Sequence, residues 1–174
     1  MMMRVLVFLV LLLASPAALA QDAADRAFAA AADAFETALP ALGRELYGVD
    51  LAAYRDGLTL RRFSSAHWGV TVRLAVTSPS SASGDCGRFA AYVTIPPQEG
   101  VVWLALCPQF YQEGTDGLRR LTVLHEMVHV VAGPDECRAM AFAARIEQVA
   151  TGRHTPVDRY WEANGCVGSG FTLP

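Results

Sequence analysis

One helical stretch with three ionisable side chains constrains this chain more than any other feature of its sequence. The stretch is LTVLHEMVHVVA, residues 121–132, and it carries His125, Glu126 and His129 among apolar neighbours. Residues four positions apart lie on the same face of an α-helix, so the two histidines point the same way with Glu126 beside them. This is the HExxH pattern, in which two imidazoles bind zinc and the glutamate accepts a proton from water that the metal activates.

An ordinary helix with an i,i+4 pair is the alternative explanation of the pattern. HExxH also arises by chance, and surface helices often carry such pairs. Here apolar residues surround the three polar ones on all sides, as in a helix that is buried in a core. Burying two imidazoles and a carboxylate without partners costs several kcal/mol, and a bound metal removes most of that cost. The sequence therefore predicts a metal site.

The N-terminus has the features of a secretion signal. Residues 1–20 contain one early positive charge, a short apolar run over 5–13 and the small-residue ending Ala-Leu-Ala. The run is too short to span a bilayer, so we predict a cleaved signal peptide over residues 1–20 and no stable membrane insertion after cleavage. The protein would then be secreted or periplasmic. Residues 21–174 have the length of a single domain.

Four cysteines follow this segment, and an even number in an exported chain predicts two disulfides. Three pairings exist. We favour Cys86–Cys107, which would join two neighbouring strand regions, and Cys137–Cys166, which would tie the C-terminal tail to a helix beside the metal site. Zinc ligation by these cysteines is less favoured because the sequence has no CxxC-type pair.

The remaining patterns predict an α+β domain. An alanine-rich amphipathic helix is expected from Gln21 to about Tyr47, interrupted at Pro40. A small, mostly antiparallel sheet of three or four strands is expected to follow. Its last strand is entirely apolar and therefore central. The strand-like runs lie at residues 58–60, 70–76, 89–95 and 101–106.

Two consecutive helices are expected around the HExxH pattern. The first covers about 118–132 and ends at Gly133, where glycine permits a left-handed turn. The second covers about 134–151. The tail over 152–174 is expected to be irregular apart from a short helical turn at 157–162 that packs over the domain.

A catalytic zinc site needs a third protein ligand and one open position, and the candidates are Asp135, Glu136 and Glu147. Glu147 lies about 11 residues beyond Glu136, or roughly 16 Å further along the second helix, which is too far. Counting from His129, as in zincins with the HExxHxxGxxH pattern, points to Asp135. Counting from Gly133, where the backbone must reverse, points to Glu136. We prefer Glu136 and keep Asp135 as the alternative, and whichever does not bind the metal is expected to cap the second helix.

The ordered combination of these motifs resembles the aspzincin zinc endopeptidases, which include deuterolysin and the peptidyl-lysine metalloendopeptidases. The resemblance covers roughly residues 86–144. It rests on Cys86, Ala91-Tyr92 in a strand, Leu106-Cys107-Pro108 followed by Phe110, the HEMVH sequence and Gly133-Pro134-Asp135-Glu136. In that family the HExxH helix is followed by GTxDxxYG, whose aspartate is the third zinc ligand and whose tyrosine assists transition-state binding. The resemblance implies a zincin-like fold that binds Zn²⁺, with Glu136 at the position of the ligand aspartate.

Two positions depart from the family pattern. Ala139 stands where the tyrosine is expected, and Met140 where the second glycine is expected. Loss of the tyrosine removes the expected oxyanion donor, whose loss could cost on the order of a hundredfold in rate. Candidate replacements are Tyr111, Tyr160, His154 and Arg138.

The resemblance implies a secreted zinc endopeptidase that acts on a peptide or protein substrate. Glu126 would be the general base that takes a proton from the attacking water and later delivers it to the leaving amine. The missing tyrosine motivates a second hypothesis, a degenerate zincin that binds peptides or proteins with weak or no cleavage. The net charge of −3 gives no electrostatic case for a nucleic acid partner.

Overall fold

The structure is a computed structural model that describes residues 16–112 and 115–174. The predicted signal peptide falls largely on residues 1–15, which lie outside the described residues. Helices and short strands are mixed along the chain, so the α+β prediction is confirmed at this level. In chain order the elements are α1 (Pro16–Ala38), η1 (Leu39–Ala41), β1 (Glu45–Leu46), β2 (Val49–Asp50), α2 (Leu51–Leu60), β3 (Arg62–Ser65), β4 (Val70–Thr77), η2 (Gly84–Gly87), β5 (Ala91–Gln98), β6 (Val101–Leu106), η3 (Pro108–Tyr111), α3 (Asp116–Ala132), α4 (Glu136–Thr151) and α5 (Asp158–Ala163).

Four strands form the main sheet, in the order β3-β4-β6-β5. β3 pairs antiparallel with β4, β4 pairs parallel with β6, and β6 pairs antiparallel with β5. The sheet is therefore mostly antiparallel, and the apolar strand β6 is an interior strand, as predicted. β5 is the last strand, so one of its edges has no partner among the described strands of this sheet.

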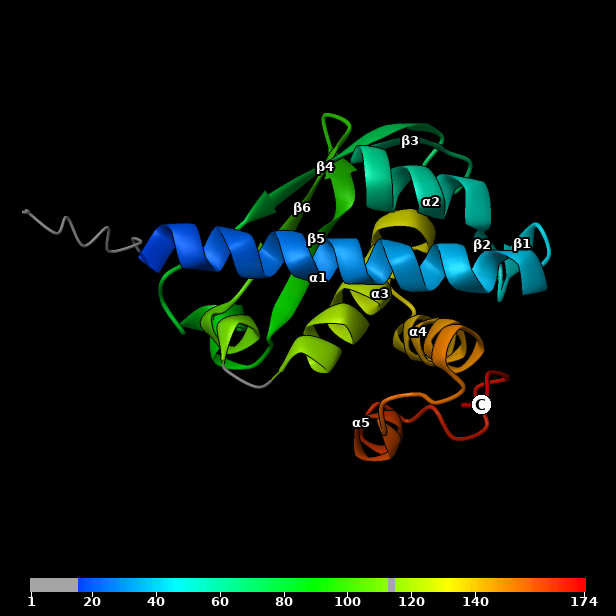
Figure 1. The fold of residues 1–174 in the computed structure, drawn as a ribbon. Coiled ribbons are helices and arrows are strands. Elements are labelled where there is room, and N and C mark those ends of the chain that lie inside the picture. The colour runs from blue at the N-terminus through cyan, green and yellow to red at the C-terminus, as the bar shows by residue number, and fades with distance from the viewer. Residues whose placement is uncertain (1–15, 113–114) are drawn as a thin grey trace, which may run out of the picture.

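One face of the sheet packs against the helices. Val72, Leu74 and Leu104 are buried, whereas Arg73 and Trp103 on the opposite face are exposed, as the alternation of strand side chains requires. α3 contacts β5 on one side, and it also contacts α1, α2 and α4. Figure 1 shows α1 running across the width of the fold, with α2 on one side of it and α4 and α5 on the other. Because other elements surround α3, its sequence is apolar almost all round.

The N-terminal helix ends earlier than its sequence pattern predicts. α1 ends at Ala38, and Glu45–Leu46 forms the strand β1 instead of a last helical turn. Pro40 lies in the 3₁₀ turn that follows α1; proline lacks an N–H donor and disfavours a helical residue before it. α1 begins at Pro16, so this helix extends across the predicted cleavage position after Ala20.

The prediction of a strand at residues 58–60 is wrong, because these residues form the last turn of α2. The Asp50 carboxylate caps this helix by accepting hydrogen bonds from two N–H groups of its first turn, at 2.9 and 3.1 Å. Leu51, Tyr54 and Leu58 are buried at helical spacing. A short apolar run does not by itself distinguish a strand from a buried helical turn. The strand in this region is β3, which follows α2 directly.

Both favoured disulfides are present. Cys86–Cys107 joins η2 to the residue after β6, and Cys137–Cys166 joins the first turn of α4 to the C-terminal tail. None of the cysteines is therefore free to bind a metal. The predicted helical turn in the tail is α5, which buries Trp161 against the domain.

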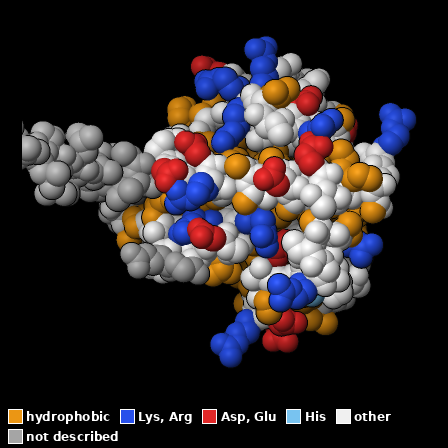
Figure 2. All heavy atoms as spheres, viewed as in Figure 1, with side chains coloured by type: hydrophobic (Ala, Val, Ile, Leu, Met, Phe, Trp, Pro, Cys, Tyr) orange, Lys and Arg blue, Asp and Glu red, His pale blue; other side chains and the backbone are white. Residues whose placement is uncertain are grey.

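The surface of the described residues carries mixed charge on the face drawn in Figure 2. Acidic and basic side chains are interspersed there, and neither sign forms an extended patch. Proteins that bind nucleic acid present a basic stripe or patch, and this face has none. As a separate finding, no helix of the described residues is both long and apolar enough to cross a membrane.

Candidate metal centre

The helix α3 holds the HExxH residues in fixed positions. Two side chains from other elements donate hydrogen bonds to its carbonyl groups: the Tyr54 hydroxyl to Leu124 O and the Trp68 indole N–H to Val130 O, both at 2.8 Å. Apolar side chains on the remaining faces of α3 are buried in the main core. The helix thus has little freedom to rotate or slide, which is what a precise ligand site requires.

His125, His129 and Glu136 come together at the junction of α3 and α4. Their ligand atoms all lie within 4.8 Å of one another, so this cluster could hold a metal ion. The Nε2 atoms of the two histidines are 3.1 Å apart. The Glu136 carboxylate oxygens lie 3.2 Å from His125 Nε2 and 3.6 Å from His129 Nε2.

These spacings fit a tetrahedral ion. Zinc binds nitrogen and oxygen ligands at about 2.05 Å, and a tetrahedron with that radius has edges of about 3.3 Å. The distance between the two Nε2 atoms, 3.1 Å, and the distances from His125 Nε2 to Glu136 Oε2, 3.2 Å, and from His129 Nε2 to Glu136 Oε1, 3.6 Å, are all close to that edge length. Two imidazole nitrogens this close also need a proton or a cation between their lone pairs. The donor set and its geometry therefore suit a small divalent cation.

The chain itself sets the tautomer of His129. Its Nδ1 lies 3.0 Å from the carbonyl oxygen of Gly133, and because a carbonyl only accepts, Nδ1 carries the proton. Nε2 is then left with a free lone pair that faces the cluster, the usual arrangement of a metal-binding histidine. Gly133 has a positive φ of 89°, which lets the chain reverse at this point.

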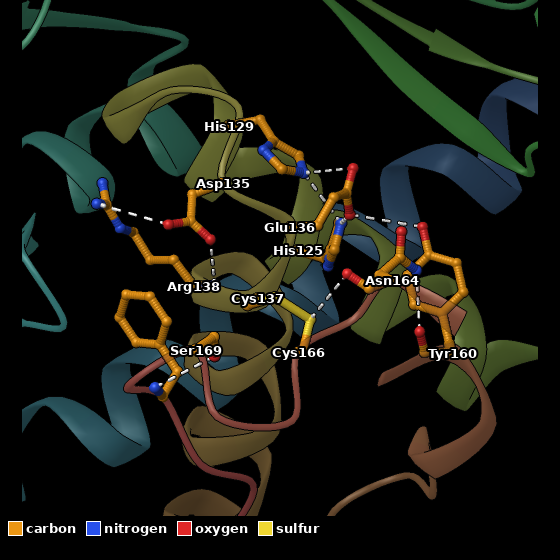
Figure 3. The surroundings of a disulfide bond; sticks show 11 residues. His125, His129, Asp135, Glu136, Cys137, Arg138, Tyr160, Asn164, Cys166 and Ser169 are labelled. Atoms are coloured by element: carbon orange, nitrogen blue, oxygen red, sulfur yellow. Dashed lines mark hydrogen bonds and ion pairs between the residues drawn. A yellow bond between two sulfur atoms is a disulfide. The ribbon is translucent and has the colours of Figure 1, made fainter. Parts of the chain in front are cut away.

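The structure distinguishes the positions of Asp135 and Glu136, which counting along the sequence did not. Asp135 is the N-cap of α4, and its carboxylate accepts a hydrogen bond from the N–H of Arg138 at 3.0 Å. Figure 3 shows the Glu136 carboxylate turned toward the two imidazoles and the Asp135 carboxylate turned toward Arg138. The geometry thus places Glu136 in the cluster and gives Asp135 the capping position. Ligation itself stays a prediction.

Glu126 lies beside the cluster and is almost completely buried. Burial raises the pKa of Glu126, and the charge of Glu136 adds to the rise, while the charges of His125 and His129 oppose it. A carboxylate with a raised pKa is a better proton acceptor near neutral pH than an ordinary glutamate.

The pKa values of His129 and Glu136 both shift against the direction that burial alone would give. Burial alone would lower the pKa of His129, but its hydrogen bonds to Glu136 and Gly133 and the charge of Glu126 raise it overall. Burial alone would raise the pKa of Glu136, but the hydrogen bonds and charges of His125 and His129 depress it far below the usual range. The contacts with the Glu136 carboxylate therefore favour the protonated form of His129 in the absence of a metal, and a bound cation would take the place of that proton.

Glu147, the distant candidate ligand, lies away from the cluster. It is fully buried and accepts hydrogen bonds from the Arg120 guanidinium at 2.6 and 3.0 Å and from the Thr155 N–H at 2.8 Å. These partners satisfy its charge, so Glu147 has a structural role.

Among the four candidate replacements for the tyrosine of the aspzincin pattern, Tyr160 contacts the cluster. Its hydroxyl lies 3.5 Å from a Glu136 oxygen, and its ring centroid is 6.3 Å from that of His125. Burial together with the charges of Glu136 and Glu126 raises the pKa of Tyr160 to about 12, so the hydroxyl keeps its proton at neutral pH. The other three candidates bond elsewhere: Tyr111 to Ser78, His154 to Gln148, and Arg138 to the carbonyl of Ala132.

The sequence indicates Tyr160 as one of four candidates and does not distinguish it from the other three. One signal could have pointed to the site, namely the predicted disulfide Cys137–Cys166. It fixes the tail six residues after Tyr160 to the residue that follows Glu136. Figure 3 shows the disulfide and Tyr160 on the same side of the cluster.

Two hollows flank the cluster along β5. One has a volume of about 280 Å³ and is bordered by His125 and Glu126. The other has a volume of about 190 Å³ and is bordered by His129 and Glu126. Phe89, two residues before β5, and Ala91, the first residue of β5, border both hollows. The cluster therefore lies in a cleft that runs beside the unpaired edge strand.

Comparisons with protein-family models, with curated proteins and with solved structures found no match to this chain. The resemblance to aspzincins therefore stays a prediction from the motifs. Function has to be inferred from the chemistry of the cluster and the cleft around it.

Proposed function

We propose that this protein is a zinc-dependent endopeptidase of zincin-like fold, an atypical relative of the aspzincins. The observation that carries the proposal is the grouping of His125, His129 and Glu136 around one point, with the buried Glu126 beside them. A cluster that only bridged two helices would not need a free proton acceptor next to it in a cleft.

Zinc is the proposed ion because two imidazoles and one carboxylate form a ligand set of catalytic zinc sites. Zinc in such a site lowers the pKa of water and polarises a carbonyl group. The described residues contribute three donor atoms to the cluster, and the flanking hollows leave one side accessible. Three protein ligands with an open position are typical of a catalytic site, whereas structural zinc sites are closed by four.

Glu126 is the proposed general base. It takes a proton from water as the water attacks the scissile carbonyl, and it delivers the proton to the leaving amine. Its raised pKa supports both steps, because the carboxylate binds the proton more firmly than an exposed glutamate would. General base catalysis of this kind typically contributes a factor of about 10² to 10⁴ in rate.

Tyr160 is the proposed hydrogen-bond donor to the developing oxyanion. Its hydroxyl is protonated at neutral pH and lies at the edge of the cluster, within reach of a group that approaches His125. It would replace the tyrosine that the aspzincin pattern places at Ala139. Such a donor acts most strongly where water is excluded, as in a half-buried cleft.

The edge strand β5 is the proposed binding site for the peptide backbone. An extended substrate can add to an unpaired strand edge by main-chain hydrogen bonds, with its side chains in the hollows that alternate along the strand. The two disulfides support a site of action outside the cytoplasm, because disulfides persist in oxidising compartments. We propose that the protein is secreted or periplasmic.

Proteolysis of a general substrate, measured with zinc, with a chelator and after zinc is restored, tests the proposal. We expect activity that the chelator abolishes and zinc restores. Glu126→Gln is the matched control, because it keeps the shape and removes the base; we expect it to bind zinc and to lose nearly all turnover. Wild-type activity that survives this substitution would refute the mechanism.

The second candidate is a degenerate zincin that binds peptides without cleaving them. The observation that favours it is the buried alanine at position 139, which offers no hydroxyl where the family has its tyrosine. Zinc bound in a one-to-one ratio, peptide binding along β5 and no turnover of any peptide in a library would establish this candidate.

A further inference from the structure

The face of the main sheet that points away from the helices carries positive charge and no negative charge. We call it the outer sheet face; its side chains alternate with the buried ones and belong to residues 62, 64, 71, 73, 75, 92, 94, 101 and 103. Arg62 and Arg73 are exposed on it. The four strands contain no aspartate or glutamate, although the whole chain has a net charge of −3. This face therefore differs in charge from the chain as a whole.

The two arginines of the outer sheet face are a repulsive pair. Arg62 of β3 and Arg73 of β4 lie directly opposite each other. The N–H of Arg73 donates to Gly100 O at 2.8 Å, on the side of β6, so Arg62 and Arg73 form the type of antiparallel pair without mutual hydrogen bonds. Side chains are closest in such pairs, and like charges there repel. Neither guanidinium forms an ion pair with a carboxylate of residues 16–112 and 115–174, so a bound anion would relieve the repulsion.

An exposed indole lies near the middle of the same face. Trp103 belongs to the interior strand β6, with Ala75 opposite it on one side and Thr94 on the other, and 43% of its surface is accessible. Because alanine and threonine are short, they do not cover the indole. The exposed residues Ser64 and Thr71 add further hydroxyl groups. The outer sheet face thus combines two cations, one flat apolar ring and several small hydroxyls.

This combination fits a chain of sugar rings that carry carboxylate groups. A sugar ring presents a face of C–H groups that packs on an indole, and its hydroxyls bond to side-chain hydroxyls. The planar guanidinium of arginine binds a planar carboxylate through two parallel hydrogen bonds. A lipid surface fits less well, because membrane-bound faces bury a continuous apolar area and Trp103 is the one large apolar side chain that is well exposed among the residues of this face. Nucleic acid binding typically needs a larger basic patch than two arginines.

We propose that the outer sheet face binds a carboxylated polysaccharide, with Arg62 and Arg73 on its carboxylate groups and Trp103 against a sugar ring. The proposal does not depend on peptidase activity, because the three residues of the candidate metal centre lie on α3 and α4 and not in the sheet. Binding of this kind would hold an exported protein on a glycan surface and leave the metal centre free.

Titration of the purified protein with polygalacturonate, followed by calorimetry, tests the proposal. We expect saturable binding that weakens as salt is added. Arg62→Gln together with Arg73→Gln should weaken binding about tenfold, as expected for two exposed ion pairs, and Trp103→Thr should weaken it about fivefold. Arg145→Gln together with Arg153→Gln is the matched control, because it removes two exposed positive charges at α4 and beyond its end and should leave binding nearly unchanged.

Thermal unfolding without ligand tests the repulsive pair separately. Arg62→Gln should raise Tm, because it removes the repulsion; a lower Tm would show that the fold stabilises this arginine and would overturn the proposal. No binding of polygalacturonate, or binding that the control weakens as much as the change at Arg62 and Arg73, also overturns it. The same holds if Trp103→Thr has no effect and if dextran sulfate, duplex DNA or vesicles of equal parts phosphatidylcholine and phosphatidylserine bind as tightly.

Discussion

The third ligand of the proposed zinc site is tested most directly by replacing each of two adjacent carboxylates, one at a time, by the corresponding amide. Glu136→Gln and Asp135→Asn make the same chemical change one residue apart, and neither alters side-chain length. In the structure the Glu136 carboxylate faces the imidazoles and the Asp135 carboxylate caps α4. We therefore expect Glu136→Gln to weaken zinc binding and Asp135→Asn to leave it nearly unchanged, because asparagine caps helices about as well as aspartate.

The size of the effect follows from the number of ligands. Structural zinc sites with four ligands bind with about 10 to 16 kcal/mol, which is about 3 kcal/mol for each ligand or roughly a hundredfold in Kd. At a free zinc concentration of 100 times the wild-type Kd, zinc stabilises the wild-type protein by about 2.7 kcal/mol and a variant with a hundredfold higher Kd by about 0.4 kcal/mol. For a domain of this size these energies correspond to shifts of about 8 °C and 1 °C in Tm.

Thermal unfolding with zinc and with excess chelator is the assay, and competition with a fluorescent zinc indicator gives Kd independently. The chelator series is the internal control, because a general loss of stability lowers Tm in both series and leaves the zinc-dependent shift intact. If Asp135→Asn abolishes the shift while Glu136→Gln keeps it, the aspartate is the third ligand and the geometric argument is wrong.

Three further predictions concern the groups around the cluster. Tyr160→Phe should lower kcat on the order of a hundredfold with little change in zinc affinity, because it removes only the hydroxyl that we propose as the oxyanion donor; an unchanged kcat would exclude that role. Burial raises the pKa of Glu126, so folding takes up protons there and the metal-free protein loses stability as pH rises through its pKa. The Tm of metal-free Glu126→Gln should accordingly match that of wild type near about pH 4 and exceed it near about pH 7, whereas a constant difference would contradict the shift. Replacing Cys137 and Cys166 by alanine should lower the free energy of unfolding in urea by about 3 to 4 kcal/mol, given their sequence separation of 29. The replacement should also reduce kcat by releasing the tail that carries Tyr160; full activity would show that the disulfide does not position Tyr160.

The parts of the fold that follow local rules could be predicted from the sequence. α3 was predictable because its HExxH residues and apolar neighbours repeat at helical spacing, and Gly133 marks its end. β4 and β6 were predictable because they are long runs of branched side chains. The turn at residues 58–60 was assigned wrongly because three residues carry too little periodicity, and the capping role of Asp50 was overlooked.

The parts of the site that depend on tertiary placement could not be predicted. Counting along the sequence left both Asp135 and Glu136 as candidate ligands. The two residues are adjacent, and one step along a helix turns the direction of a side chain by about 100°. The backbone angles at Gly133 decide which of the two faces the histidines. Tyr160 could not be placed either, because its position depends on how α5 packs and on the disulfide that anchors the tail.

The residues from His129 to Cys137 connect the HExxH helix to the third side chain of the cluster and to the C-terminal tail. The carbonyl of Gly133 fixes the tautomer of His129, and the positive φ of the same glycine reverses the chain. A side chain at position 133 would be strained at this φ, and its Cβ would lie 2.7 Å from Nε2 of the exposed His67, which would have to move. Glu136 follows three residues later, and Cys137 then fixes the tail. Hydrogen bonds and packing between protein groups thus hold the three side chains of the cluster together. If the cluster binds zinc as we propose, the ion would meet ligands that the chain has already positioned, and we expect the protein to stay folded in excess chelator, which circular dichroism would check.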